Sequence, residues 1–163
     1  MEKIDGSIRL VERLLICGAF IVMVLVTFAQ VVARFIFRDP ISWTEELARF
    51  LFVWITLIGS AHAIAFGKHF RVDFLIGRFS PALQKRIEYA IVAFVFAFAS
   101  IMIAYGCSVS WRTRFQISPA LELPMSYPYL CIPVAGLFIV IHLVSGLFAG
   151  AKAASGAGGG HAE

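Results

Sequence analysis

Two histidines in long apolar stretches are the residues whose type could do chemistry inside a membrane. His62 and His142 lie in separate apolar runs, and each is placed toward the same side of the membrane. Two neutral imidazoles at similar depth on two helices can ligate a haem, as in membrane-bound b-type cytochromes. Alternatively, each is a hydrogen-bonded packing residue or lies near the membrane interface. Nothing else in the sequence marks a cofactor, so we favour packing.

The cysteines suggest neither a metal site nor a disulfide framework. Cys17, Cys107 and Cys131 all lie inside apolar runs, without the spacing of metal ligands. A disulfide between Cys107 and Cys131 is chemically permitted outside the cytoplasm. Small buried thiols suit their apolar surroundings better. We therefore expect no metal and no cofactor.

The elements that carry these residues are predicted from four runs without Asp, Glu, Lys or Arg. The runs span residues 14–33, 50–67, 89–111 and 123–151. About 20 apolar residues in a helix cross the hydrocarbon core, and helices satisfy their own backbone hydrogen bonds there. The sequence predicts an all-α integral membrane protein. Its single four-helix domain covers residues 1–150, with spans near 14–33, 50–67, 89–111 and 129–149.

Two of the helices are expected to begin before their apolar parts. Ser42 and Glu45 have the spacing of a capping box, and Ser80 followed by Pro81 is typical of a helix start. The second and third helices therefore extend beyond the bilayer core at their N-terminal ends. Pro133 is expected in or near the first turn of the last helix. The Ala/Gly-rich tail, residues 151–163, is expected to be disordered.

The distribution of basic residues predicts the orientation. The two tails and the middle loop together hold nine Lys and Arg residues, and the other two loops hold five. Because loops rich in Lys and Arg stay in the cytoplasm, we expect both termini there.

The composition excludes several classes of function. Hydrophobic residues make up 60% of the 163 residues and charged residues 15%, with a net charge of +4. A soluble enzyme or a nucleic-acid-binding protein would be far less apolar. Ion-coupled transporters usually carry ionisable groups within the membrane. Since the four runs carry no carboxylate or basic side chain, we expect no independent transport of a charged substrate.

The segment 43–73 resembles a known transporter family. It contains WTEELAR at 43–49, then Trp54 and Gly59, then GKHFRVD at 67–73. The pattern is similar to the DctQ-like small membrane subunit of tripartite ATP-independent periplasmic (TRAP) transporters. The resemblance extends from the first helix to Gly136.

This resemblance implies a division of labour among three proteins. A periplasmic substrate-binding protein captures an organic acid, and a large multi-span membrane subunit carries the sodium and substrate sites. A chain of this kind is a permease subunit of the inner membrane, surrounded by lipid and with no catalysis or nucleic-acid binding. It would scaffold the large subunit and help dock the binding protein during sodium-driven uptake.

The residues that match the family pattern are the candidate site residues. The partner-interface candidates are Trp43, Glu45, Glu46, Arg49, Trp54 and Gly59. The cytoplasmic-loop candidates are His69 and Asp73, for which subunit packing or loop structure is expected. For the charged candidates near residue 45, a capped helix end at the membrane surface is the alternative interpretation.

Two other functions remain open from the sequence. The first is a haem-binding membrane anchor of a redox enzyme that uses His62 and His142. The second is a small four-helix exporter, which the missing intramembrane carboxylate disfavours.

Overall fold

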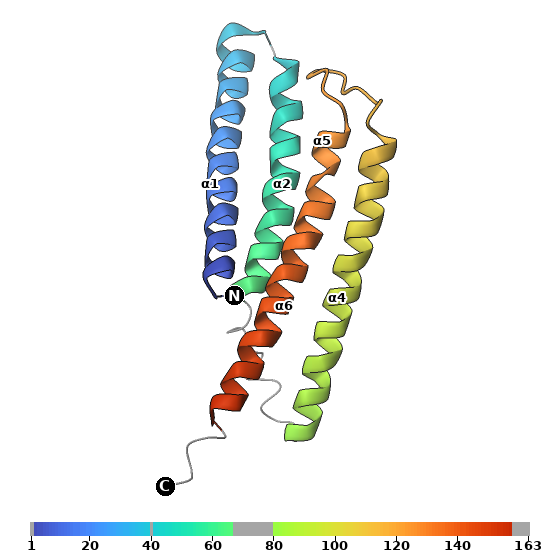
Figure 1. Ribbon diagram of the computed structural model, residues 1–163. Coiled ribbons are helices and arrows are strands. Elements are labelled where there is room, and N and C mark those ends of the chain that lie inside the picture. The colour runs from blue at the N-terminus through green and yellow to red at the C-terminus, as the bar shows by residue number, and fades with distance from the viewer. Residues whose placement is uncertain (1, 40, 67–79, 158–163) are drawn as a thin grey trace.

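The computed structural model describes residues 2–39, 41–66 and 80–157 (Figure 1). Two of the candidates, His69 and Asp73, lie outside the described residues. Four helices are long and apolar enough to cross a membrane, and the chain is all-α as predicted. The helical elements are α1 (Glu2–Val32), the π-helix η1 (Ala33–Phe37), α2 (Ser42–Phe66), α4 (Pro81–Arg112), α5 (Ser126–Tyr129) and α6 (Cys131–Ala157).

The predicted helix boundaries are largely explained by local chemistry. Helix α2 begins at Ser42 and α4 at Pro81, each well before its charge-free run. Pro133 lies in the first turn of α6, where its missing N–H has no helical partner to lose. Helix α6 continues to Ala157, into the tail we expected to be disordered from residue 151, because alanine favours the helix.

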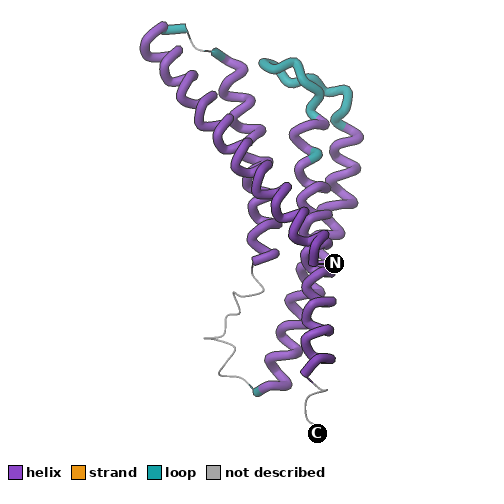
Figure 2. Tube along the Cα trace, turned by 60° about the vertical axis from the view of Figure 1, so that its left-hand side comes forward, coloured by secondary structure: helices purple, strands orange, loops and turns teal. Residues whose placement is uncertain are grey.

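The long helices form a row. Helix α1 packs on α2, α2 on α6, and α6 on α4, so α1 and α4 occupy the two edges (Figure 1). We call the end where α1 begins and α6 ends the terminal end, and the end with residues 38–39, 41 and 113–125 the loop end. Figure 2 shows that the α1–α2 pair diverges from the α4–α6 pair toward the loop end. Within the described part of the chain, a row leaves both of its broad faces uncovered.

The buried core is small for a chain of this size. Its central cluster is Ala61, Ala99 and Ile139, from α2, α4 and α6. Many large apolar side chains, such as Phe28, Phe94 and Tyr105, are exposed. Lipid or a partner subunit must therefore cover them.

Glycines bring α4 and α6 close together. A Cβ at Gly106 would lie 2.7 Å from Cδ of Pro133, and one at Gly136 would lie 2.9 Å from Cγ1 of Ile103. Both distances are too short for a real Cβ contact. Helices in lipid associate through such close packing, since burial of apolar surface gives little drive there.

Candidate functional site

A groove opens at the loop end between the α1–α2 pair and the loop that follows α4. Its volume is about 410 Å³. It is lined by Arg34 of η1, by residues of the first two turns of α2, and by Pro119 and Ala120 of the loop. The groove therefore collects charged candidate residues from the start of α2. Its lining is Gln30, Arg34, Ile41, Ser42, Glu45, Glu46, Arg49, Pro119 and Ala120.

Glu46 joins α2 to the loop. Its Oε2 atom accepts hydrogen bonds from the backbone N–H groups of Ala120 and Leu121, both at 2.9 Å. Two N–H groups converging on one carboxylate oxygen make a small anion-binding site from backbone alone. We call this interaction the Glu46 contact.

The loop that meets Glu46 has its own backbone structure. Residues Ile117 and Pro124 form an antiparallel bridge, and the N–H of Ser118 donates to the carbonyl of Leu123 at 2.9 Å. Between them, Glu122 turns the chain with a φ of 55°. The loop therefore presents the N–H groups of residues 120 and 121 in a defined position.

Glu45 and Arg49 line the same groove and pair with each other. Arg49 Nη2 donates to Glu45 Oε1 at 3.2 Å, and their side chains are 69% and 66% exposed. The pairing directs Glu45 toward Arg49, whereas the capping-box prediction had it reaching back to the helix start. Trp43 is 44% exposed. An exposed ion pair contributes little to stability, so these side chains are available to a partner.

Trp54 and Gly59 do not join the groove. Trp54 lines a separate apolar cavity of about 230 Å³ between α1 and α2. Gly59 lies ten residues after Arg49, about 15 Å farther along the helix. A Cβ added at Gly59 would meet nothing within 4 Å. The structure therefore divides the partner-interface candidates into a loop-end group and a deeper pair.

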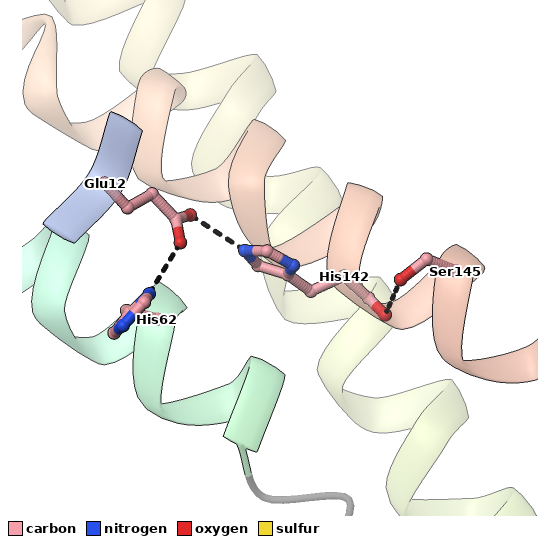
Figure 3. A network of polar contacts seen from close by, with 4 residues as sticks. All are labelled: Glu12, His62, His142 and Ser145. Carbon is pink, nitrogen blue, oxygen red and sulfur yellow. Dashed lines mark hydrogen bonds and ion pairs between the residues drawn. The ribbon is translucent and has the colours of Figure 1, made fainter. Parts of the chain in front are cut away.

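A second polar cluster lies at the terminal end and contains both intramembrane histidines. Glu12 of α1 places Oε2 2.8 Å from His62 Nδ1 of α2, and Oε1 2.8 Å from His142 Nε2 of α6 (Figure 3). The side chains of Glu12 and His142 are fully buried, and that of His62 is 20% exposed. We call Glu12, His62 and His142 the Glu12 cluster.

This geometry favours the hydrogen-bonded interpretation of the two histidines. His62 Nδ1 and His142 Nε2 are each hydrogen-bonded to the Glu12 carboxylate. A haem bound at those nitrogens would have to displace it. The described residues also contain no group of three or more His, Cys, Asp or Glu side chains arranged to hold a metal ion.

The sequence interpretation missed Glu12. It lies two residues before the charge-free run that begins at residue 14, yet the candidate membrane span formed by α1 and η1 is Gly6–Phe37. The run holds no carboxylate, as stated, but the longer span contains Glu12. The two histidines could have pointed to Glu12. Buried imidazoles need hydrogen-bond partners, and the predicted topology placed Glu12 on the same side of the membrane as His62 and His142.

The cysteines are free thiols. Cys107 is exposed and Cys131 is buried, so the permitted disulfide between them is absent. The thiol of Cys131 donates to the carbonyl oxygen of Pro128 at 2.8 Å. It contributes to the junction between α5 and α6.

Comparison with known proteins assigns the family. The model of the DctQ component of tripartite ATP-independent periplasmic transporters matches residues 23–153. The isethionate TRAP transporter permease protein DctMQ of Oleidesulfovibrio alaskensis is 31% identical over 148 residues, covering 82% of this chain and 22% of its own length.

Two sialic acid transporter proteins are also similar. The permease protein SiaT of Haemophilus influenzae is 24% identical over 77% of this chain, which matches 20% of SiaT. The small permease protein SiaQ of Vibrio cholerae is 25% identical over 91% of this chain and 86% of its own length. The chain thus spans about a fifth of two of these relatives and most of the third. It belongs to the DctQ family of TRAP transporter small permease subunits, which are multi-pass membrane components of transporters and not enzymes.

Proposed function

We propose that this chain scaffolds the large, sodium-coupled permease subunit of a TRAP transporter in the bacterial inner membrane. It also helps dock the periplasmic substrate-binding protein during uptake of an organic acid. The open row of helices, with its small core and uncovered faces, is the observation that carries the scaffolding role. A row that cannot bury its own apolar faces suits a stationary surface for a larger membrane protein.

The fused relatives support this partnership. In DctMQ and SiaT, the segment similar to this chain is 22% and 20% of a protein named as a permease. A chain of this kind therefore works there within a much larger permease. The separate small subunit would make the same association through noncovalent contacts.

The exposed face of α4 suits close helix packing. Ser100, Ala104 and Ser108 are exposed and recur every four residues. The Ser100 hydroxyl donates to the carbonyl of Phe96 at 2.8 Å, which satisfies its polar group without a partner. Small side chains allow another helix to approach closely.

The loop-end groove supports a docking role. It contains Arg34 and Arg49 together with Glu45, which gives a polar rim carrying charges of both signs. Such a surface suits a water-soluble partner better than an apolar helix does. The distribution of basic residues favours an orientation with the loop end outside and both termini in the cytoplasm.

The proposed substrate class rests on the relatives' names. They specify isethionate, sialic acid, C4-dicarboxylates and ectoine. Each of these carries an acidic group, so an organic acid is the proposed cargo. Selectivity would reside mainly in the other two components.

Reconstitution tests this function directly. The tagged chain is expressed with the permease gene and the binding-protein gene that accompany it, and sodium-dependent uptake is measured in proteoliposomes. We expect uptake only when all three proteins are present. Equal uptake without this chain would refute the scaffolding and docking roles.

A further inference from the structure

Glu12 connects two helices that are not neighbours in the row. Helix α1 packs mainly along α2, and α2 separates it from α6 over most of its length (Figure 1). At the terminal end, Glu12 reaches both helices through the two imidazoles (Figure 3). The cluster therefore joins three of the four spanning helices at a single depth.

The hydrogen bonds of the Glu12 cluster have defined directions, and breaking one would lower the stability of the bundle. A carboxylate oxygen accepts hydrogen bonds, and an imidazole nitrogen that carries a proton donates them. Each carboxylate oxygen receives one of these bonds. Losing either bond would leave a buried polar atom without its partner. The arrangement thus strongly favours one placement of α1 relative to α6.

A long helix amplifies any change at this cluster. Arg34, on the wall of the loop-end groove, lies 22 residues beyond Glu12, about 33 Å along the helix. A tilt of about 5° at Glu12 would move that wall by about 3 Å. Pro119 and Ala120, which also line the groove, belong to the loop that follows α4. Glu46 joins this loop to α2, so the distance from Arg34 to the loop depends on how α1 is held against α2 and at the terminal end.

We propose that Glu12 is a positioning residue that sets the width of the loop-end groove by holding α1 and α2 against α6. Its consequence for docking rests on the proposed function of the groove. The effect on groove width stands on the geometry of this chain alone.

Spin-label distances across the groove test the proposal in the full chain in lipid nanodiscs. Labels are placed at Val31 of α1 and Ile117 of the loop, both exposed, with the three native cysteines replaced by alanine. We compare the parent with Glu12→Gln, Glu12→Ala, the single variant His142→Glu and the exchange Glu12→His/His142→Glu. Arg13→Gln is the control, since Arg13 is an exposed charge beside Glu12.

We expect a narrow distance distribution in the parent and in Arg13→Gln. Glu12→Ala should shift or broaden the distribution, by about 3 Å for a tilt of about 5°. Glu12→Gln should have a smaller effect. The exchange should restore much of the parent distribution, because it rebuilds a carboxylate–imidazole pair between α1 and α6. If Glu12→Ala does not fold, Glu12→Gln and the exchange decide the result.

Two results would overturn the proposal. One is a parent-like distribution in both Glu12→Gln and Glu12→Ala. The other is an exchange variant no closer to the parent than the single His142→Glu variant. Binding of the substrate-binding protein to the complete transporter is measured separately. Failure of binding in the parent complex would refute the docking role while leaving the distance result standing.

Discussion

Glu12 and Glu46 connect the same two helical pairs at opposite ends of the molecule, with different partners. Glu12 is fully buried and uses both carboxylate oxygens, one for each imidazole. Glu46 is partly buried and uses one oxygen for two backbone N–H groups. The terminal-end link therefore depends on three side chains, whereas the loop-end link depends on one side chain and the shape of a loop.

This difference determines how each link fails. Side-chain partners can be removed by substitution, so the Glu12 cluster can be broken from any of its three members. Backbone donors persist in almost any sequence, so the Glu46 contact is lost only through Glu46 or through a change in the loop. An amide oxygen can replace the single accepting oxygen of Glu46 but cannot replace both accepting oxygens of Glu12.

The largest expected effect is that of Glu12→Ala. It removes the carboxylate that contacts both imidazoles, and each buried hydrogen-bonding group that loses its partner costs about 1–3 kcal/mol. Thermal unfolding in detergent should show a clear fall in the midpoint. Arg13→Gln should remain close to the parent, and an equal fall in both variants would contradict the assigned role of Glu12.

The next prediction compares the stability of the variants Glu12→Gln and Glu46→Gln. Glu12→Gln should destabilise by about 1–3 kcal/mol, because one imidazole N–H loses its acceptor. Glu46→Gln should cost less, about 1 kcal/mol or below, because Oε1 of the amide can still accept from both N–H groups. Denaturant titration of both variants measures the difference. A greater loss for Glu46→Gln would reverse the comparison between the two ends.

A pair of glycine substitutions tests the close packing of α4 on α6. Neither Glu12 nor Glu46 takes part in this packing. Gly106→Ala places a Cβ against the ring of Pro133 and should cost about 1–3 kcal/mol through overpacking. Gly59→Ala enters open space and should be neutral or slightly stabilising in a helix. Unfolding midpoints report both, and equal costs would contradict the close packing at Gly106.

The smallest effect on stability is expected for Glu45→Gln and Arg49→Gln. Their ion pair is exposed, so each change should stay within about 0.5 kcal/mol of the parent. If these side chains contact the binding protein, docking should weaken while assembly and stability remain normal. Surface plasmon resonance against the reconstituted complex measures this, and unchanged docking would remove Glu45 and Arg49 from the proposed interface.

Much of the fold was predictable because the membrane imposes a strong constraint on sequence. The charge-free runs predicted the four helices, and Ser42, Pro81 and Pro133 indicated their starts. The order of helices in the row was not predictable, since lipid-facing and helix-facing positions are equally apolar. The close seam at Gly106 and Pro133 was missed for the same reason.

The candidate site was predicted unevenly. The segment containing Glu46 was identified through its resemblance to a family, but its partners are backbone groups 74 and 75 residues away, which no side-chain pattern reveals. Glu12 was overlooked because each span was defined as a run without charged residues. This definition began the first span after Arg13 and left Glu12 outside it. His62 and His142 were correctly singled out, and their favoured interpretation as hydrogen-bonded residues agrees with the structure.

The most direct test of the central claim is a gentle-detergent pull-down of the tagged full chain from its native membrane. Mass spectrometry and a visible spectrum are recorded on the same sample. The account predicts a large multi-span permease in comparable amount, with no Soret absorption band. Recovery of the chain without such a permease, or with a Soret band and soluble redox subunits, would contradict it.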